Sequence, residues 1–224
     1  MHKTIFDTPV VNTAMRWLSL LLLRLLGWKT EGVAPDQPKY VLIAAPHTSN
    51  WDFPYTMMLC FALGLRVYWM GKASLFRWPL GPLARWLGGI PVQRSVTANM
   101  VQATVDTFGR QSRLVIVVAP EGTRGKVSHW KTGFYHIAHG ARVPVALAYL
   151  DYQRKAGGIG QMFHTTGDIE ADMQQIQQFY RGVTGKNQDQ FNAAQIQAQI
   201  KAQSGAEARV KAEAQAKAES KRRR

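Results

Sequence analysis

Several residue types and motifs are scarce or missing in this chain, and each absence excludes a class of protein. Cys60 is the only cysteine among 224 residues, which excludes disulfide frameworks and cysteine-based zinc sites and favours a reducing compartment. The sequence has no HExxH motif and no GxSxG elbow. The usual sequence frames of zinc proteases and serine hydrolases are therefore excluded, and no metal site is expected.

Two glycine-containing stretches do not complete a nucleotide-binding motif. In GTRGK, residues 122–126, two residues rather than four separate the glycines, and no Ser or Thr follows the lysine. This spacing differs from that of a phosphate loop. The stretch GGIGQMF, residues 157–163, lacks the dinucleotide fingerprint. We therefore set both readings aside.

Acidic residues are scarce in the middle of the chain. The net charge is +14, and residues 53–150 contain eleven Lys or Arg but only two acids, Asp106 and Glu121. A field of this sign raises the local concentration of anionic partners. Nucleic acid, anionic lipid headgroups and phosphorylated or acidic substrates all fit, and charge alone does not choose among them.

A long hydrophobic run is also missing, although residues 14–28 are strongly apolar. Arg16 and Arg24 interrupt this segment and leave only Trp17 to Leu23 unbroken, far below the ~20 residues that span a bilayer. The two arginines lie about 80° apart around a helix, which suits a helix lying in the membrane interface. Packing against the domain's own core is the alternative. We predict residues 1–30 to be a membrane-associating helix.

The rest of the chain alternates between strand and helix patterns. The apolar run at 113–119 indicates a strand buried on both faces. We therefore predict one α/β domain at 31–186, with a mixed, largely parallel sheet covered by helices. From 187 to 224 the composition shifts to Gln, Ala and Lys, which indicates a polar low-complexity tail. The predicted strands are 40–46, 66–71, 90–94, 113–119 and 143–150, and the predicted helices are 53–64, 74–88, 97–111, 129–139 and 171–183.

The stretch PHTSNWD, residues 46–52, contains a candidate base and carboxylate. His47 and Asp52 would lie about 140° apart on one helix, but a turn at the end of a strand can bring them together. A carboxylate beside one ring nitrogen fixes the tautomer and leaves the other nitrogen to take a proton. The alternative is that Asp52, which precedes Phe53 and Pro54, caps a helix and His47 is incidental.

Two further stretches are candidates for anion binding. APEGTRGK, residues 119–126, follows the most apolar predicted strand and offers backbone N–H groups, a hydroxyl and a guanidinium, which are donors suited to phosphate. Turn chemistry accounts for Pro120 and for Gly122 with a positive φ, but not for Glu121 or Arg124. GGIPVQR, residues 88–94, is a glycine turn before a short strand that ends in Arg94.

Taken together and in this order, HTSNWD, GGIPVQR, PEGTR and VPVALAYLD resemble the four motifs of the glycerophospholipid acyltransferase family. That family includes the bacterial 1-acylglycerol-3-phosphate acyltransferases. The resemblance extends from about Tyr40 to Tyr152. Two departures border the acceptor site and put the identity of the acceptor in question: Gly125 stands where the family commonly has Ser, and NWDFPYTMM is unusually rich in aromatic residues and proline.

The resemblance implies a role for each matching residue. His47 would be the general base that deprotonates the acceptor hydroxyl, and Asp52 its orienting partner, with direct attack on the donor thioester and no acyl-enzyme. Lys72 would stabilise the oxyanion or contact phosphate, with an ordinary exposed lysine as the alternative. Val143 and Pro144 would shape the acyl-binding side. The acceptor phosphate would be bound by Arg94, Glu121, Gly122, Thr123 and Arg124.

The resemblance also implies substrates and a location. The acceptor would be a lysophospholipid, above all 1-acylglycerol-3-phosphate, with another lysolipid such as lyso-ornithine lipid as the alternative. The donor would be acyl-CoA or acidic acyl-acyl carrier protein as co-substrate, without any metal or redox cofactor. The enzyme would lie, peripheral or monotopic, on the anionic cytoplasmic face of the inner membrane. Two alternatives are a basic nucleic-acid or anionic-membrane binding module and a catalytically silent relative; we expect no nucleic-acid partner.

Overall fold

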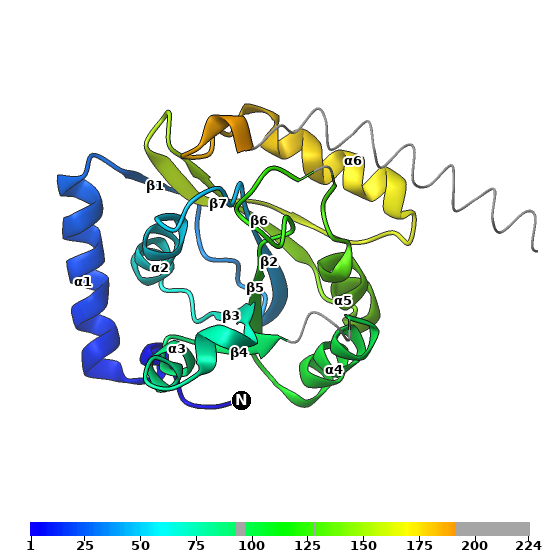
Figure 1. The fold of residues 1–224 in the computed structure, drawn as a ribbon, viewed down its shortest axis with the longest axis horizontal. Coiled ribbons are helices and arrows are strands. Elements are labelled where there is room, and N and C mark those ends of the chain that lie inside the picture. Colours follow the sequence, from blue (N-terminus) through cyan, green and yellow to red (C-terminus); the bar gives the residue numbers. More distant parts are fainter. Residues whose placement is uncertain (93–96, 128, 191–224) are drawn as a thin grey trace, which may run out of the picture.

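A computed structural model describes residues 1–92, 97–127 and 129–190. Figure 1 shows a central sheet with helices on both of its faces. The strands are β1 (Lys29–Glu31), β2 (Lys39–Ala45), β3 (Tyr68–Lys72), β4 (Gly89–Val92), β5 (Leu114–Val118), β6 (Val145–Asp151) and β7 (Ala156–Phe163). The α-helices are α1 (Pro9–Leu25), α2 (Asp52–Leu63), α3 (Gly81–Trp86), α4 (Thr97–Arg110), α5 (Gly133–Ala141) and α6 (Ile169–Phe179). Short 3-10 turns are η1 (Ile5–Asp7), η2 (Ala73–Phe76), η3 (Tyr180–Gly182) and η4 (Gln188–Gln190).

The seven strands form one sheet in the order β1-β7-β6-β2-β5-β3-β4. All neighbouring pairs are parallel except β6 and β7, which are antiparallel. The predicted mixed, largely parallel α/β sheet is therefore confirmed. The parallel strands β2, β3, β5 and β6 end at one edge of the sheet, which is where ligands bind in open α/β folds. The segments that follow these strands carry the candidate site.

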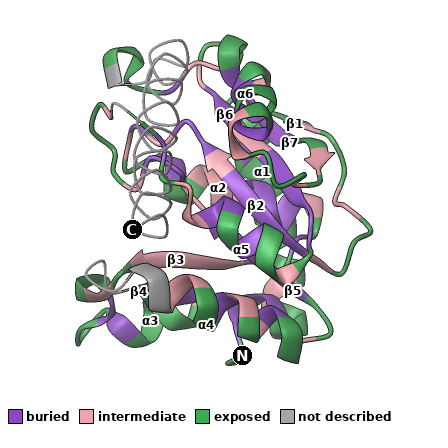
Figure 2. Ribbon diagram, turned by 90° about the vertical axis from the view of Figure 1, so that its right-hand side faces the viewer, coloured by how far each residue is buried: buried purple, intermediate pink, exposed green. Residues whose placement is uncertain are grey.

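Strand β2 lies in the middle of the sheet and is buried on both faces. Val41 and Ile43 pack into one apolar cluster, with Phe134 and other residues of the α4–α5 side. Tyr40 and Leu42 point to the opposite face and pack into a second cluster with residues of α2. Most of β2 accordingly has the colour of buried residues in Figure 2, with Lys39 and Ala44 of intermediate burial. This arrangement explains why the sequence is continuously apolar here rather than alternating.

The N-terminal segment packs on the domain and also exposes apolar side chains. Ile5 and Phe6 of η1 join the second core cluster, and α1 lies against α2. Within α1 only Ser19 and Leu23 are buried, whereas Val10, Trp17, Leu18, Leu20, Leu21, Leu22 and Leu25 are exposed. In the described part of the chain, no helix has both the length and the apolar character needed to cross a membrane.

Several predicted elements differ from the observed ones. The predicted helix at 74–88 is divided into η2 and α3, with Pro79 between them, and the residue before a proline is disfavoured in a helix. The predicted helix at 129–139 begins only at Gly133, and the one at 171–183 ends at Phe179. Strands β1 and β7 were not predicted.

The reason β7 escaped prediction is its glycine content, because glycine weakens a strand pattern. A side chain at Gly158 would place its Cβ 1.8 Å from the carbonyl oxygen of Glu31 in β1. The glycine therefore permits the close approach of β1 to β7. Residues 157–163, the glycine-rich stretch without a dinucleotide fingerprint, therefore belong to β7, next to the edge strand β1.

Candidate functional site

The turn between β2 and α2 brings His47 and Asp52 into contact. The Nδ1 atom of His47 lies 3.1 Å from Oδ2 of Asp52. The two side chains meet across a turn at the end of a strand, which is the arrangement that the sequence allowed. The His47 side chain is 30% exposed and that of Asp52 only 4%. With Nδ1 directed at the carboxylate, Nε2 is the ring nitrogen placed to exchange a proton with a substrate.

Asp52 organises the turn through several hydrogen bonds. Its Oδ2 atom accepts from the backbone N–H groups of Thr48 at 2.7 Å and Ser49 at 2.8 Å, while Oδ1 accepts from the Tyr152 hydroxyl at 2.7 Å. The expectation that Asp52 caps the helix is wrong in its geometry. Helix α2 begins at Asp52 with Trp51 at the N-cap position and no side-chain cap, because the carboxylate points back into the preceding turn.

These contacts keep Asp52 ionised despite its burial. Burial by itself raises the pKa of Asp52, but hydrogen bonds from His47, from the Ser49 backbone and from Tyr152 outweigh it and lower the pKa below its usual value. A buried carboxylate beside an imidazole stabilises the protonated ring. This arrangement suits proton transfer at His47.

Glu121 lies behind the turn at residues 46–52 and does not line the cavity. It is only 4% exposed, and its Oε1 atom accepts from the backbone N–H of His47 at 3.1 Å. Among the described residues, Oε2 has no hydrogen-bond partner. Burial raises the pKa of Glu121 to about 7. The family resemblance implied a place for Glu121 at the acceptor phosphate, whereas its contact in the structure is with the backbone of His47.

A cavity of about 900 Å³ opens in front of His47 and Asp52. One part is lined by apolar side chains of α2, β3, η2 and α3, and the volume is in the range of sites for drug-sized ligands. Cys60 lies in this apolar lining, where burial raises the pKa of its thiol to about 12. The inert thiol and its neighbours form a surface suited to a hydrocarbon chain, lined by Leu42, Met57, Leu59, Cys60, Leu63, Leu65, Val67 and Leu87.

Cationic and hydroxyl groups line the other part of the cavity. Lys72 at the end of β3, and Thr123 and Arg124 after β5, all reach it, together with Gly122. Gly122 has a φ of 64°, and its N–H donates to Ala119 O at 3.0 Å, which is the tight glycine turn expected from the sequence. Four of the predicted binding residues are thus gathered on the same cavity as His47.

Three other predicted residues have different positions. Arg94 lies outside the described residues. Val143 and Pro144 are buried at the beginning of β6, where Pro144 O accepts from the N–H of Val41 at 3.0 Å. They do not line the cavity, because the site is at the opposite end of the strand. Ala148, Tyr149 and Leu150 of β6 line it instead.

Lys131 is a cavity residue that sequence reasoning missed. A Cβ built on Gly122 would lie 3.0–3.1 Å from the Cδ, Cε and Nζ atoms of Lys131, so the lysine side chain covers the glycine turn. Its backbone N–H donates to Pro120 O at 2.8 Å. The signal available in the sequence was the cationic block KVSHWK, which directly follows the turn.

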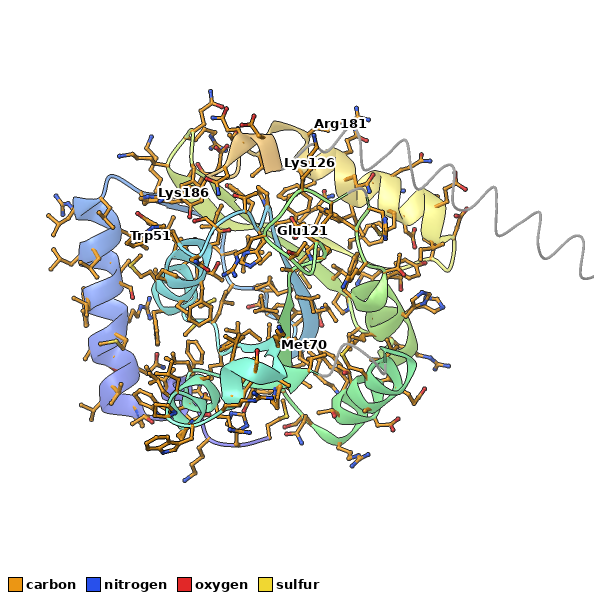
Figure 3. All side chains as sticks on the ribbon, in the orientation of Figure 1. Trp51, Met70, Glu121, Lys126, Arg181 and Lys186 are labelled. Atoms are coloured by element: carbon orange, nitrogen blue, oxygen red, sulfur yellow. The ribbon has the colours of Figure 1, made fainter. Side chains whose placement is uncertain are left out.

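Tyr152 and the segment after η3 also support the turn at residues 46–52, and the sequence did not predict this. Asn187 donates from Nδ2 to Thr48 O at 2.8 Å, although it was expected to begin the solvated tail. The Lys186 ammonium lies 4.9 Å from the ring centre of Trp51, and Figure 3 shows the two residues close together beside α2. The chain after η3 thus packs against the turn; most of the predicted tail, 191–224, lies outside the described residues.

The described residues contain no cluster of three or more His, Cys, Asp or Glu side chains that could hold a metal ion. Among the described side chains, His47 is placed for proton transfer, the cationic side chains for anion binding and the apolar lining for burial of an apolar chain.

Comparisons with known proteins agree with this arrangement. A search of curated protein sequences gave no match. The crystal structure of the 1-acyl-sn-glycerophosphate (LPA) acyltransferase PlsC from Thermotoga maritima has a similar fold, with a TM-score of 0.55 and 19% sequence identity. The match covers 75% of this chain and 76% of that protein. The model of the acyltransferase family matches residues 30–149, more than half of the sequence and including both His47 and Glu121–Arg124. The chain therefore belongs to the acyltransferase family.

Proposed function

We propose that this acyltransferase moves a fatty acyl group from acyl-CoA or acyl-acyl carrier protein to the free hydroxyl of a lysophospholipid, with 1-acylglycerol-3-phosphate as the acceptor. The observation that carries the proposal is the position of the His47–Asp52 pair on a cavity that is cationic in one part and apolar in another. An acceptor with one phosphate and one acyl chain matches both parts.

The proposed reaction needs one base and no covalent enzyme intermediate. Nε2 of His47 takes the proton from the acceptor hydroxyl, and that oxygen forms a bond to the thioester carbonyl carbon. The tetrahedral intermediate then expels the donor thiolate, which takes the proton back from the imidazolium. Asp52 holds the tautomer and stabilises the imidazolium during these steps.

Charge stabilisation would come from the cationic side of the cavity. Lys72 is placed to stabilise the developing oxyanion or to contact the phosphate. Arg124 offers a guanidinium for bidentate phosphate binding, and Thr123 and Lys131 add further donors. The acceptor's ester-linked chain would extend into the apolar lining around Cys60.

Membrane association is part of the proposal. Helix α1 exposes Trp17, Leu21 and Leu25 to solvent while carrying Arg16 and Arg24. An exposed apolar helix face with flanking arginines is typical of helices that lie in an anionic membrane interface. We propose that the enzyme is peripheral or monotopic at the cytoplasmic face of the inner membrane.

The test is thioester consumption by purified protein, with wild type beside His47→Ala and His164→Ala. His164 is an exposed histidine outside the cavity lining, so its variant is the matched control. Both donors would be offered with a panel of lysolipids. We expect turnover with lysophosphatidate, reduced roughly 10²–10⁴-fold in His47→Ala and unchanged in His164→Ala.

Two other results would change the proposal. Activity with a different lysolipid alone, such as lyso-ornithine lipid, would keep the mechanism and replace the acceptor. No turnover across the panel, together with salt-dependent DNA binding that His47→Ala leaves unchanged, would favour a basic binding module instead.

A further inference from the structure

The segment from η2 to α3 carries a cluster of apolar side chains on the protein surface. Trp78 is 88% exposed and Leu80 66%. Figure 2 shows that this part of the fold consists mainly of exposed residues. We call the cluster the η2–α3 lip; its members are Leu75, Trp78, Leu80, Leu83 and Trp86, all of which are exposed.

The lip is continuous with the cavity. Leu75, Leu80 and Leu83 are exposed and also line the cavity that contains His47 and Asp52. Trp78 and Trp86 belong to the outer surface only, since neither is among the lining residues. The apolar part of the cavity therefore reaches the surface at these three leucines.

The charge around the lip has one sign. The sequence from 53 to 105 contains no Asp or Glu, while Arg77 and Arg85 flank the lip and are exposed. Tryptophan with a nearby arginine is a combination typical of protein surfaces at a membrane–water interface. Self-association through the lip is disfavoured, because a second copy of this chain would place like charges together. A water-soluble partner is disfavoured as well, because it would not need the cavity to open there.

We infer that the η2–α3 lip rests in the interfacial layer of an anionic bilayer and passes an acyl chain laterally between that layer and the cavity; the acyl chain as cargo rests on the proposed function. Trp78 would lie among the headgroups, with Arg77 directed at lipid phosphates; the Arg85 guanidinium, which donates to Phe76 O at 3.3 Å, would add positive charge beside the lip. The lip belongs to η2 and α3 rather than to α1, so it adds apolar side chains to those that α1 exposes.

Binding to vesicles tests the lip without any assumption about catalysis. The proteins are wild type, Trp78→Ser, Arg77→Gln and Val33→Ser, a control in which an equally exposed apolar residue outside the lip is changed. The vesicles are phosphatidylcholine with about one-third phosphatidylglycerol, and phosphatidylcholine alone. We expect Trp78→Ser to bind the anionic vesicles roughly tenfold more weakly, because the variant has no aromatic side chain to bury in the bilayer interface.

The arginine variant gives a second, independent measurement. We expect Arg77→Gln to bind the anionic vesicles about fivefold more weakly, with no change on phosphatidylcholine, and Val33→Ser to match wild type. Thermal melts confirm that each variant is folded; if Trp78→Ser is not, Arg77→Gln decides. Wild-type binding by both variants would overturn the inference. A wild-type dimer that the lip variants lose in sedimentation, while their vesicle binding stays intact, would also overturn the inference and assign the lip to self-association.

An activity measurement then tests lateral passage. Trp78→Ser should lose activity on an acceptor embedded in vesicles by roughly the factor lost in binding and keep activity on a short-chain acceptor that is monomeric in water. Equal loss on both acceptors would contradict passage through the lip. If wild type were inactive with every acceptor, the proposed function would fail, and the vesicle measurements would still decide whether the lip binds a membrane.

Discussion

The hydroxyl of Tyr152 donates a 2.7 Å hydrogen bond to Oδ1 of Asp52, one hundred residues earlier in the chain. The other carboxylate oxygen, Oδ2, faces His47. The Tyr152 ring is held edge-on against Trp28, with the two ring centres 5.0 Å apart. Trp28, shortly after α1, and Tyr152, directly after β6, thus both support the orientation of the Asp52 carboxylate.

Tyr152→Phe keeps this packing and removes only the donor to Asp52. We expect kcat to fall several-fold, in line with the roughly 0.5–1.5 kcal/mol of one hydrogen bond, and KM for the acceptor to stay constant, because Tyr152 does not line the cavity. Steady-state kinetics measure both constants. Tyr55→Phe, in the same aromatic cluster, is the control. An equal fall in kcat for both variants would indicate general loosening of the cluster.

Asp52→Asn tests the charge of the pair with little change in shape. The amide oxygen can face the N–H groups of Thr48 and Ser49, and the amide nitrogen can donate to the Tyr152 hydroxyl, so the turn should fold. The imidazolium loses its counter-charge, and we expect kcat to fall roughly 10²–10⁴-fold. Circular dichroism and kinetics would be compared at the same pH. A nearly normal kcat would show that His47 acts without the carboxylate.

Glu121 should make the stability of the protein depend on pH. Its pKa is raised from 4.5 to about 7 in the folded protein, so the folded state binds its proton more tightly than the unfolded chain does. The stabilising contribution is complete below pH 4.5 and is lost as the pH rises through 7, by about 3 kcal/mol in total.

Glu121→Gln keeps an acceptor for the His47 N–H and removes this titration. Urea unfolding at pH 5 and pH 8 should therefore show a free energy of unfolding that falls with pH in wild type by more than in the variant. Asp106→Asn, at an exposed acid of α4, is the control. Identical pH dependence in wild type and Glu121→Gln would exclude Glu121 as the titrating group.

Arg124→Ala should weaken acceptor binding more than it slows chemistry. Loss of one charge-assisted contact to phosphate costs about 1.5–3 kcal/mol of binding free energy. We therefore expect the acceptor KM to rise roughly tenfold or more, with a small change in kcat. Arg110→Ala, at an exposed arginine outside the cavity lining, controls for the loss of one positive charge. An unchanged KM in Arg124→Ala would assign phosphate binding to other cations, with Lys72 and Lys131 next to be tested.

The sequence determined the fold class and the order of most strands and helices, and the family resemblance implied the pairing of His47 with Asp52. These features depend on local signals: hydrophobic periodicity, glycine and proline positions, and a histidine and a carboxylate within one turn. The parallel strands then placed the turn after β2 and the loop after β5 at the same edge of the sheet, as the order of the motifs indicated.

Only the tertiary structure decided which way the key side chains point. Glu121 and Arg124 belong to one short turn, yet Glu121 lies buried under the backbone of His47 and Arg124 lines the cavity. Tyr152 meets Asp52 because β6 lies beside β2 in the sheet, a contact between residues too distant in sequence for any periodic pattern to report. The opening of the cavity between the leucines of η2 and α3 likewise depends on packing, because exposure is a property of the folded surface and not of a residue type.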